Sequence, residues 1–434
     1  MIINIFLKKR SLIDLFLFLL ILETLFSENN YRPVISSIQI QGNSKTQNFI
    51  IEREIQHPLN VPLDSNLVLK DRDRIENLGL FSEVKWKSTP IEDGTAILFF
   101  IVIESIQKTP PIALPTYDED KGWSLTGIWL INNFRGRNQS LAIGGSIGGE
   151  DTYGFNYSDP WIFGDHVSFS LNIGRSLYKH RFLNRELDVN SFVIKFGRWF
   201  GNSIKTSFGL ELENKKFFND LISYEYFYLA PMVTLKYDTR DIFWNPSKGV
   251  LFSQYVYHQK GLKPRDWSKT LWTQSYSLYK KINNNNKKLI FAFNGTLSRM
   301  LGNKDENWLD YFGNSMTIRG WVLPDSSLYY SGVEDFRFGF QSARTTFELR
   351  QEVIPKYATP IGIEFGLVFV IFSDIGIITN EWNSLKDQSP MLGTGLGFRI
   401  PFPMVGSIRI DYGWGYRNGG WNSGSIHWGI GQKF

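Results

Sequence analysis

From about residue 112 to the end of the chain, apolar and polar residues alternate with a period of two. This alternation is typical of β-strands that bury one face and present the other to water. In the clearest segment, one face carries Ile408, Ile410, Tyr412 and Trp414, and the other carries Ser407, Arg409, Asp411 and Gly413. The pattern predicts sixteen strands, at 112–117, 123–132, 139–148, 152–159, 166–175, 187–199, 203–214, 227–238, 249–258, 268–281, 288–300, 344–354, 362–373, 391–400, 406–415 and 425–434.

Most of these segments have the length that a tilted strand needs to cross a bilayer, about ten residues. A water-soluble sandwich would hide its apolar faces inside, whereas a membrane barrel turns them toward lipid and encloses the polar faces. An even number of antiparallel strands is usual in single-chain bacterial barrels, and closure leaves no free edge. We therefore predict an all-β, 16-stranded antiparallel transmembrane β-barrel over residues 112–434, with a long loop at 301–343.

Residues 33–105 follow a different pattern, in which helical and strand periodicities succeed one another. Strands are predicted at 34–41, 81–88 and 95–104, and a first helix at 45–55. A second helix begins at Asp64 or Ser65, either of which can cap it, and ends at Gly79. This order predicts an α+β domain with helices on one face of a small sheet, joined to the barrel by a linker at 106–111.

The first 27 residues are typical of a secretory signal peptide. Basic residues at 8–10 precede a short apolar run at 15–22, and we place the cleavage site near Ser27. An uncleaved anchor is the alternative, although the run is shorter than the roughly 20 apolar residues that span a bilayer as a helix.

Composition narrows the choice of function. The mean hydropathy of −0.20 argues against a membrane protein built from helices, while the 16% aromatic content suits a membrane barrel with aromatic girdles. The chain has no cysteine, which excludes disulfides and thiol catalysis. The net charge of +5 is spread along the chain, so no nucleic-acid partner is expected.

No enzyme site, cofactor or metal site is expected. The five histidines show no paired metal-ligand spacing. Gly144-Gly145-Ser146-Ile147-Gly148 fits the Gly-x-Ser-x-Gly motif by letter, but it lies within an alternating strand. A hydrolase nucleophile needs a sharp turn from strand to helix, so we predict no catalytic role for Ser146.

Five stretches together carry a family resemblance. They are Asn77-Leu78-Gly79-Leu80-Phe81-Ser82-Glu83-Val84; Asn156-Tyr157-Ser158-Asp159-Pro160-Trp161-Ile162-Phe163-Gly164; Leu235-Lys236-Tyr237-Asp238-Thr239-Arg240-Asp241; Ile318-Arg319-Gly320-Trp321; and Phe372-Ser373-Asp374-Ile375-Gly376. The first, with its corner at Leu78, Gly79 and Phe81, resembles the POTRA signature. The other four, in this order, resemble motifs of the outer-membrane assembly and translocation barrels, the BamA/TamA-like surface-antigen family. The resemblance extends from about residue 33 to Phe434.

The resemblance implies that the loop at 301–343 folds into the barrel lumen. Arg319 would then pair with Asp374, which matches by motif, and with Glu348, which lies on the face that Arg350 and Glu352 share. A guanidinium between two carboxylates bonds in a planar fork that lysine cannot copy. Phe372 and Gly376 complete the Asp374 motif, and Asp238, Arg240 and Asp241 suit a charge network near a barrel rim. Arg319 in a solvated surface loop, or acids that are merely solvated lumen charges, are the alternatives.

The same resemblance implies a non-enzymatic insertase or translocase in the bacterial outer membrane, with a POTRA domain in the periplasm. Its partners would be the lipid bilayer, unfolded outer-membrane or secreted client proteins, and periplasmic or lipoprotein accessory subunits. Clients would enter at a lateral seam between the first and last strands, since Pro115 cannot donate to a ladder and Gly429 and Gly431 weaken the last strand. Phe434 fits the usual outer-membrane recognition signal, whereas Gln432 departs from it. A dedicated exporter of one secreted partner and a passive channel remain open as alternatives.

Overall fold

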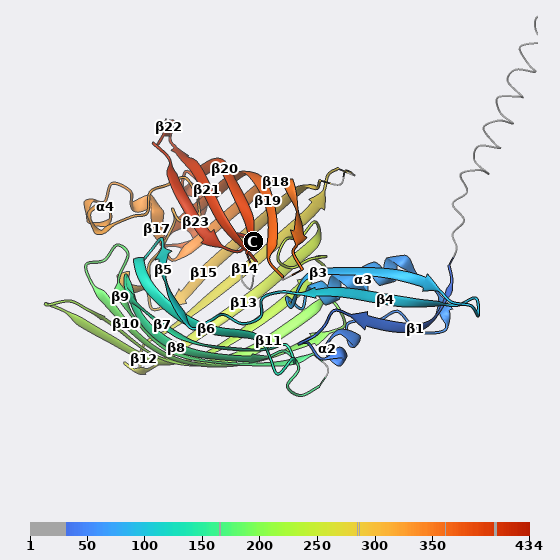
Figure 1. Ribbon diagram of the computed structural model, residues 1–434. Helices are drawn as coiled ribbons and strands as arrows, with labels where there is room; N and C mark the ends of the chain where they lie inside the picture. Colours follow the sequence, from blue (N-terminus) through green and yellow to red (C-terminus); the bar gives the residue numbers. More distant parts are fainter. Residues whose placement is uncertain (1–31, 165, 284, 286, 361, 403–405) are drawn as a thin grey trace, which may run out of the picture.

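The computed structural model describes residues 32–164, 166–283, 285, 287–360, 362–402 and 406–434 (Figure 1). The predicted signal peptide lies outside the described residues. Two parts are visible, a small α/β unit at the N-terminal side and one large curved sheet. Among the described residues, no helix has the length and apolar character needed to cross a bilayer.

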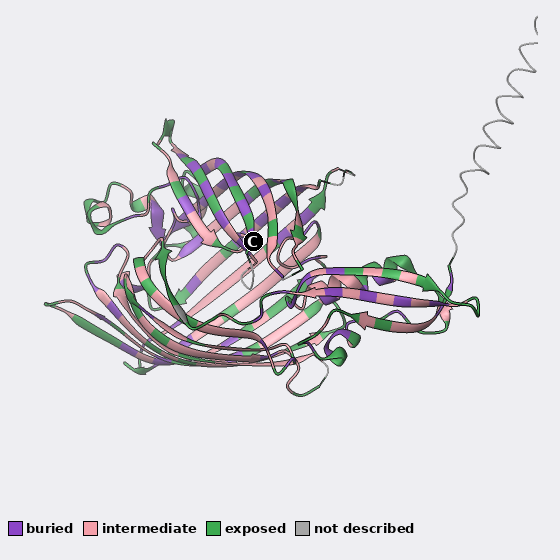
Figure 2. Cartoon of the chain, in the orientation of Figure 1, coloured by how far each residue is buried: buried purple, intermediate pink, exposed green. Residues whose placement is uncertain are grey.

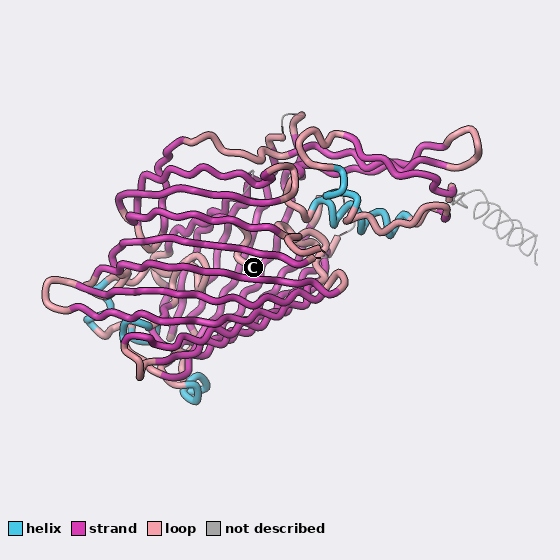
Figure 3. Tube along the Cα trace, turned by 90° about the horizontal axis from the view of Figure 1, so that it is seen from below, coloured by secondary structure: helices cyan, strands magenta, loops and turns pink. Residues whose placement is uncertain are grey.

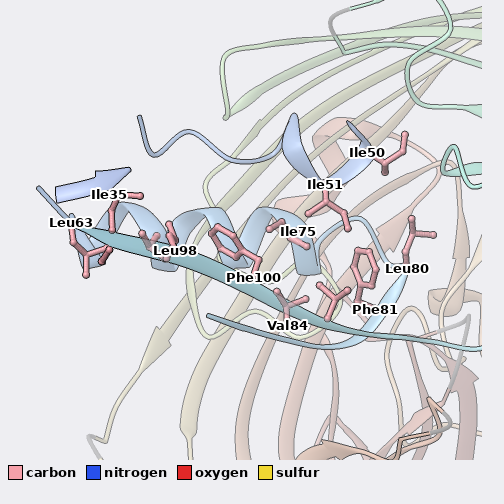
Figure 4. Packing of buried hydrophobic residues seen from close by; sticks show 13 residues of the cluster. Ile35, Ile50, Ile51, Leu63, Ile75, Leu80, Phe81, Val84, Leu98 and Phe100 are labelled. Carbon is pink, nitrogen blue, oxygen red and sulfur yellow. The ribbon is translucent and has the colours of Figure 1, made fainter. Parts of the chain in front are cut away.

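The N-terminal unit packs two helices against a four-stranded sheet. Its elements are β1 (Val34–Gln41), α2 (Asn48–Glu52), β2 (Val61–Pro62), α3 (Ser65–Glu76), β3 (Phe81–Pro90) and β4 (Ala96–Glu104), in the sheet order β2-β1-β4-β3. The Asp64 carboxylate caps α3 by accepting from the backbone N–H groups of Asn66 and Leu67. Apolar side chains such as Ile51, Ile75 and Phe100 fill the space between helix and sheet (Figure 4).

The sequence analysis missed β2 and made the first helix too long. Lys45 and Thr46 donate their backbone N–H groups to the Glu104 carboxylate at distances between 2.7 and 3.1 Å. This contact holds the residues before Asn48 as a loop rather than as a helical turn. A distant acidic side chain therefore decides where α2 begins, which no local pattern could reveal.

The large sheet is antiparallel throughout and all-β, as predicted, and contains seventeen strands. They are β5 (Ile112–Asp118), β6 (Gly122–Phe134), β7 (Gln139–Gly148), β8 (Glu150–Asp159), β9 (Val167–Lys179), β10 (Glu186–Phe200), β11 (Ile204–Phe218), β12 (Ser223–Asp238), β13 (Lys248–Lys263), β14 (Ser268–Lys281), β15 (Leu289–Gly302), β18 (Gln341–Ala358), β19 (Glu364–Thr379), β20 (Met391–Phe402), β21 (Gly406–Arg417), β22 (Gly420–Trp421) and β23 (Ser425–Ile430). The additional strand, β22, has two residues and pairs with the same strand as β23 does, namely β21.

Alternating burial marks the two faces of this sheet (Figure 2). In β21, Arg409 and Asp411 are fully buried, whereas Ile410 between them is 45% exposed. In β18, Glu348 is buried between the exposed Phe347 and Leu349. Polar side chains thus point into the curve of the sheet and apolar side chains point outward, which is the arrangement that a lipid-facing surface requires.

The strand order is that of a ring, in which β23 returns beside β5. Residue-by-residue registers connect each strand from β5 to β21 with the next strand of the sheet, and connect β21 with β23. β5 and β23 have only seven and six residues, so any pairing between them is short. A side chain also joins them, since the Trp428 indole N–H donates to the Tyr117 carbonyl oxygen over 2.9 Å. We call this boundary the seam.

Residues 303–340 form the long connection between β15 and β18, which we call the lid loop. It contains η1 (Glu306–Trp308), β16 (Asp310–Tyr311), α4 (Ser326–Ser331), η2 (Asp335–Arg337) and β17 (Phe338–Gly339). A further short helix, η3 (Trp382–Asp387), lies between β19 and β20. The strands are antiparallel, so successive connections lie at alternate ends of the sheet. The lid loop lies at one end, and the turns after β6 and β12 lie at the other.

The N-terminal unit is bound to turns at one end of the large sheet (Figures 1 and 3). The Asn77 amide donates to the Asp241 carbonyl oxygen over 2.7 Å and accepts from the Phe243 N–H over 2.8 Å. The Gln47 N–H donates to the Gly136 carbonyl oxygen over 3.0 Å. Gln56 also donates to Asn202 over 3.0 Å, so the unit is held by hydrogen bonds to three separate turns.

Candidate functional site

The lid loop carries a fully buried guanidinium, that of Arg319. The chain turns sharply after it, because Gly320 has a φ of +89° and lies against β21. A Cβ atom at Gly320 would stand 2.6 Å from the carbonyl carbon of Trp414. Only glycine permits both this backbone conformation and this close approach, so Gly320 lets Arg319 reach the inward face of the sheet.

Three carboxylates surround Arg319. Asp374 of β19 accepts from Nε over 2.8 Å, from Nη2 over 3.0 Å and from the backbone N–H over 3.0 Å. Glu348 of β18 and Asp411 of β21 both accept from Nη1, over 2.8 and 2.9 Å. The structure therefore brings the two acids singled out in the sequence together with a third, Asp411.

An aromatic ring and further charges complete this site. The guanidinium carbon of Arg319 lies 3.6 Å from the centre of the Phe372 ring, a distance typical of a cation–π contact. Four more buried cations adjoin the acids, and with Arg319 and the three carboxylates they form what we call the lid cluster: Arg350, Arg399, Arg409 and Lys433. Burial alone would lower the pKa of Arg319, but the three carboxylates outweigh it and hold that pKa well above its usual value.

Ile318, Trp321 and Gly376 place the lid loop on the sheet. Ile318 is fully buried, and the Trp321 indole N–H donates to the Leu392 carbonyl oxygen over 2.8 Å. A Cβ atom at Gly376 would stand 2.6 Å from the Phe312 ring and 2.7 Å from Ile318. The absence of a side chain at Gly376 therefore makes room for the apolar part of the lid loop.

Glu119, in the turn between β5 and β6, was missed in the sequence analysis. Its carboxylate accepts from the Ser315 N–H of the lid loop over 2.9 Å and from the Trp428 N–H of β23 over 2.8 Å. Beside it, His427 Nε2 accepts from the Gly320 N–H over 2.8 Å, so the ring proton lies on Nδ1, 3.3 Å from Glu119. Glu119 and His427 thus join the first hairpin, the last strand and the lid loop.

Burial would raise the pKa of the Glu119 carboxyl group. The contact with His427 and the two backbone N–H donors outweigh burial, and the pKa lies below its ordinary value of 4.5. The carboxylate is therefore charged at neutral pH.

The rim residues lie apart from the lid cluster, at the end of the sheet that binds the N-terminal unit. Arg240 donates from Nε to Asp238 over 2.9 Å, and Lys205 donates to the same carboxylate over 3.0 Å. The Asp241 carboxylate accepts from the Ser247 N–H over 2.9 Å, while its carbonyl oxygen binds Asn77. These residues order the turn after β12, on which the N-terminal unit rests.

Asn77 connects that turn to the corner at Leu78, Gly79 and Phe81. Gly79 has a φ of +71°, and Phe81 is buried in the core of the N-terminal unit. The corner therefore follows directly after the residue that binds the rim.

The seam residues do not share one environment. Pro115 faces Leu125 within the β5–β6 ladder, and Gly429 faces Arg409, whose Nη2 would stand 2.7 Å from a Cβ atom there. The predicted strand at 425–434 is too long, since β23 ends at Ile430. Gly431 has a φ of +78°, and this left-handed backbone turns the chain out of the strand.

The alternation of polar and apolar residues could have identified some of the site residues that the sequence analysis missed. Asp411 and Arg409 lie on the polar face that the sequence indicates for their strand, although nothing there assigns them to Arg319. Glu119 lies in a turn, where periodicity is uninformative. Lys433 was placed in the predicted strand at 425–434, but it follows the bend at Gly431.

Comparisons with known proteins agree with this geometry. Residues 133–434 match the Omp85 superfamily domain. The outer membrane protein assembly factor BamA of Neisseria meningitidis serogroup B is 23% identical over 141 residues, which cover 32% of this chain and 18% of that protein. The chain thus spans a small part of that relative.

Two solved structures share the fold at low sequence identity. BamA from Haemophilus ducreyi lacking POTRA domains 1–3 gives a TM-score of 0.54 at 13% identity, covering 92% of this chain and 84% of that one. CdiB from Escherichia coli gives a TM-score of 0.54 at 10% identity, covering 94% of this chain and 91% of that one.

Proposed function

The chain belongs to the Omp85 superfamily of outer-membrane assembly and translocation factors, and on that premise we propose that it inserts or translocates client proteins through the seam. The large sheet closes into a barrel in the bilayer, and client strands pair at the edges of β5 and β23. Main-chain pairing tolerates varied sequences, so such an edge can accept clients that share no side-chain motif.

One observation carries this proposal, namely that β5 and β23, with seven and six residues, are much shorter than strands such as β10 and β11, with 15 residues each. Neighbouring strands elsewhere are joined by ladders, such as the fifteen paired positions between β10 and β11. At the seam, side chains supply part of the contact, since Trp428 donates to the Tyr117 carbonyl oxygen and to the Glu119 carboxylate. Opening this boundary therefore breaks few backbone hydrogen bonds.

The N-terminal unit is proposed to be a single POTRA domain on the periplasmic side. Its strand β1 pairs with β2 only at Val34 and Ile35, so most of that edge is not covered by β2. An extended client segment can add to such an edge before it reaches the barrel. Lipid, unfolded outer-membrane or secreted clients, and periplasmic or lipoprotein accessory subunits are the partners that this arrangement supports.

The lid loop argues against the alternative of a passive channel. It brings a fully buried arginine onto the inward face of the sheet, where three acids bind it. An open pore has no need of this packed cluster, which occupies part of the lumen. Dedicated export of one secreted partner remains a narrower form of the same function.

A disulfide across the seam tests the proposal. The chain has no cysteine, so Tyr117→Cys with Trp428→Cys introduces one defined pair. We expect oxidation to stop client insertion and reduction to restore it. The matched control is Thr116→Cys with Ser124→Cys, which are register partners within the β5–β6 hairpin and leave the seam free. Full activity of the oxidised seam variant would contradict the proposal.

Depletion of the protein followed by an outer-membrane profile separates the narrower functions. Broad loss of membrane barrels indicates general assembly, loss of one secreted protein indicates dedicated export, and an unchanged profile indicates a passive channel.

A further inference from the structure

The four residues after β23, Gly431–Phe434, turn into the lumen; we call them the tail. The turn is made at Gly431, whose N–H donates to the Ser407 carbonyl oxygen over 2.7 Å. Lys433 is only 9% exposed, although it carries a charged side chain. A buried lysine is costly without partners, so its surroundings indicate what the tail does.

Lys433 binds both the lid loop and the acid that holds the lid loop. Its Nζ lies 2.8 Å from Asp374 Oδ2 and donates to the Thr317 carbonyl oxygen over 2.5 Å. The same Asp374 oxygen accepts from Arg319 Nε. One carboxylate thus joins the tail to the lid-loop arginine, and a second bond joins the tail to the lid-loop backbone.

Phe434 makes a separate contact on the inward face. Its ring stacks on Tyr279 with centroids 6.1 Å apart, and the Arg350 guanidinium carbon lies 5.0 Å from its centre. Arg350 also donates to Glu348. The tail therefore contacts one of the three acids around Arg319 directly, Asp374, and is linked to a second, Glu348, through Arg350.

This position of the tail is incompatible with an extended last strand. Along β23, His427 points inward, while Ile426 and Ile430 are exposed on the outer face. If the strand continued with regular alternation, Phe434 would share the outer face with Ile430. It could then not stack on Tyr279, and the left-handed turn at Gly431 would have to be lost.

We propose that the tail is a tethered ligand of a lumen site formed by Asp374, the Thr317 carbonyl oxygen, Tyr279 and Arg350. While the tail occupies this site, it holds the lid loop in place and keeps β23 short. When β23 extends along the seam, the tail leaves the site and the lid loop loses the Lys433 contacts. This inference rests on the proposed function only in taking the seam as the place where β23 extends.

Two glycines offer a matched pair of variants. Gly431 and Gly419 both have positive φ, +78° and +89°, and a Cβ atom at either would meet no atom within 4 Å. Alanine at either position therefore adds backbone strain without a clash. Gly419 lies in the turn after β21 and makes no part of the tail, so Gly419→Ala controls for strain alone.

A buried lid-loop position serves as the reporter. Ser315→Cys places the single thiol of the chain at a residue that is 8% exposed, two positions before Thr317. In this background, we expect Gly431→Ala to raise the rate of labelling by a water-soluble maleimide roughly 5- to 30-fold, which corresponds to the usual cost of a left-handed non-glycine residue. Lys433→Met should raise it as well, and Gly419→Ala should leave it unchanged.

Labelling is measured only on the folded fraction, identified by its heat-modifiable migration in gels, so a folding defect does not imitate lid release. Unchanged labelling in both tail variants, or an equal rise in Gly419→Ala, would overturn the inference. Client insertion is assayed separately on the same variants. Faster labelling without any client insertion, including in the parent protein, would count against the proposed function and leave the tail site standing.

Discussion

The wall formed by β18 to β21 and the seam between β5 and β23 hold the same sheet together in opposite ways. β18 and β19 have 18 and 16 residues and pair from Gln341↔Thr379 to Ala358↔Glu364, with the lid cluster on their inner face. β5 and β23 have seven and six residues, so any pairing between them is short. Cohesion is concentrated on one side, so the other side is the natural place for opening.

The lid loop connects these two regions. On the wall side, Arg319 binds acids of β18, β19 and β21. On the seam side, Ser315 and Gly320 bind Glu119 and His427. Changes at the seam can therefore reach the wall through one short stretch of loop. The first three predictions below each weaken one end of this connection, and the fourth acts away from it.

The largest effect is expected from Arg319→Ala, which removes the wall-side end. The acids around it lose their shared partner, and breaking a buried ion pair from one side costs about 3–5 kcal/mol. We expect a lower yield of folded barrel, measured as the heat-modifiable fraction in gels. Arg319→Lys keeps the positive charge but not the planar guanidinium that binds two carboxylates. Its yield of folded barrel should therefore lie between those of the parent protein and Arg319→Ala. A yield equal to that of the parent protein would show that the cluster does not stabilise the wall.

Glu119→Gln should have the second largest effect, because it weakens the seam-side end. Ser315 and Trp428 lose a charged acceptor, which costs about 1–3 kcal/mol if their N–H groups stay unsatisfied. We expect faster proteolysis within the lid loop without loss of the folded barrel. Glu150→Gln is the control, since Glu150 pairs with Lys121 in the neighbouring hairpin. Equal rates of lid-loop proteolysis in Glu119→Gln and Glu150→Gln would show that Glu119 does not hold the lid loop in place.

Acid should imitate Glu119→Gln in the parent protein. Because the folded-state pKa of Glu119 lies below 4.5, its charged form stabilises the fold above that pH, and the stabilisation is lost as pH falls through the lowered pKa. Lid-loop proteolysis should therefore rise below about pH 4.5, measured with an acid-active protease. The increase should be smaller in Glu119→Gln. The same acid response in both proteins would assign it to other groups.

Asn77→Ala should have the smallest effect on wall and seam, since it acts at the other end of the sheet. Two hydrogen bonds to the turn at 241–243 are lost, worth about 1–2 kcal/mol together. Hydrogen exchange should increase in that turn and in the N-terminal unit only. Increased hydrogen exchange in β18 or β23 would mean that the wall and the seam depend on the turn at 241–243.

Residue alternation was sufficient to predict the faces of the large sheet, because burial in a strand depends on parity alone. Glu348 and Arg409 could be placed on the inner face in this way. The partners of Arg319 depend on which strands lie side by side and on how far a loop folds back. Asp411 is 92 residues from Arg319, and no local pattern records that distance.

The bend at Gly431 shows a second limit of prediction. Ser425 to Phe434 reads as a regular strand, and glycine is compatible with a strand as well as with a turn. The inward turn depends on Lys433 finding Asp374, which belongs to β19. Tertiary contacts thus decide where the last strand ends.

Disulfide scanning of register tests the central claim most directly. A cysteine at position 117 is paired in turn with cysteines at 427, 428 and 429, and a cysteine at 347 is paired with cysteines at 372, 373 and 374, where Phe347 faces Ser373. We predict comparable yields for all three seam pairs and one dominant yield, 347 with 373, in the wall. A single dominant pair at the seam, as sharp as that in the wall, would contradict the account.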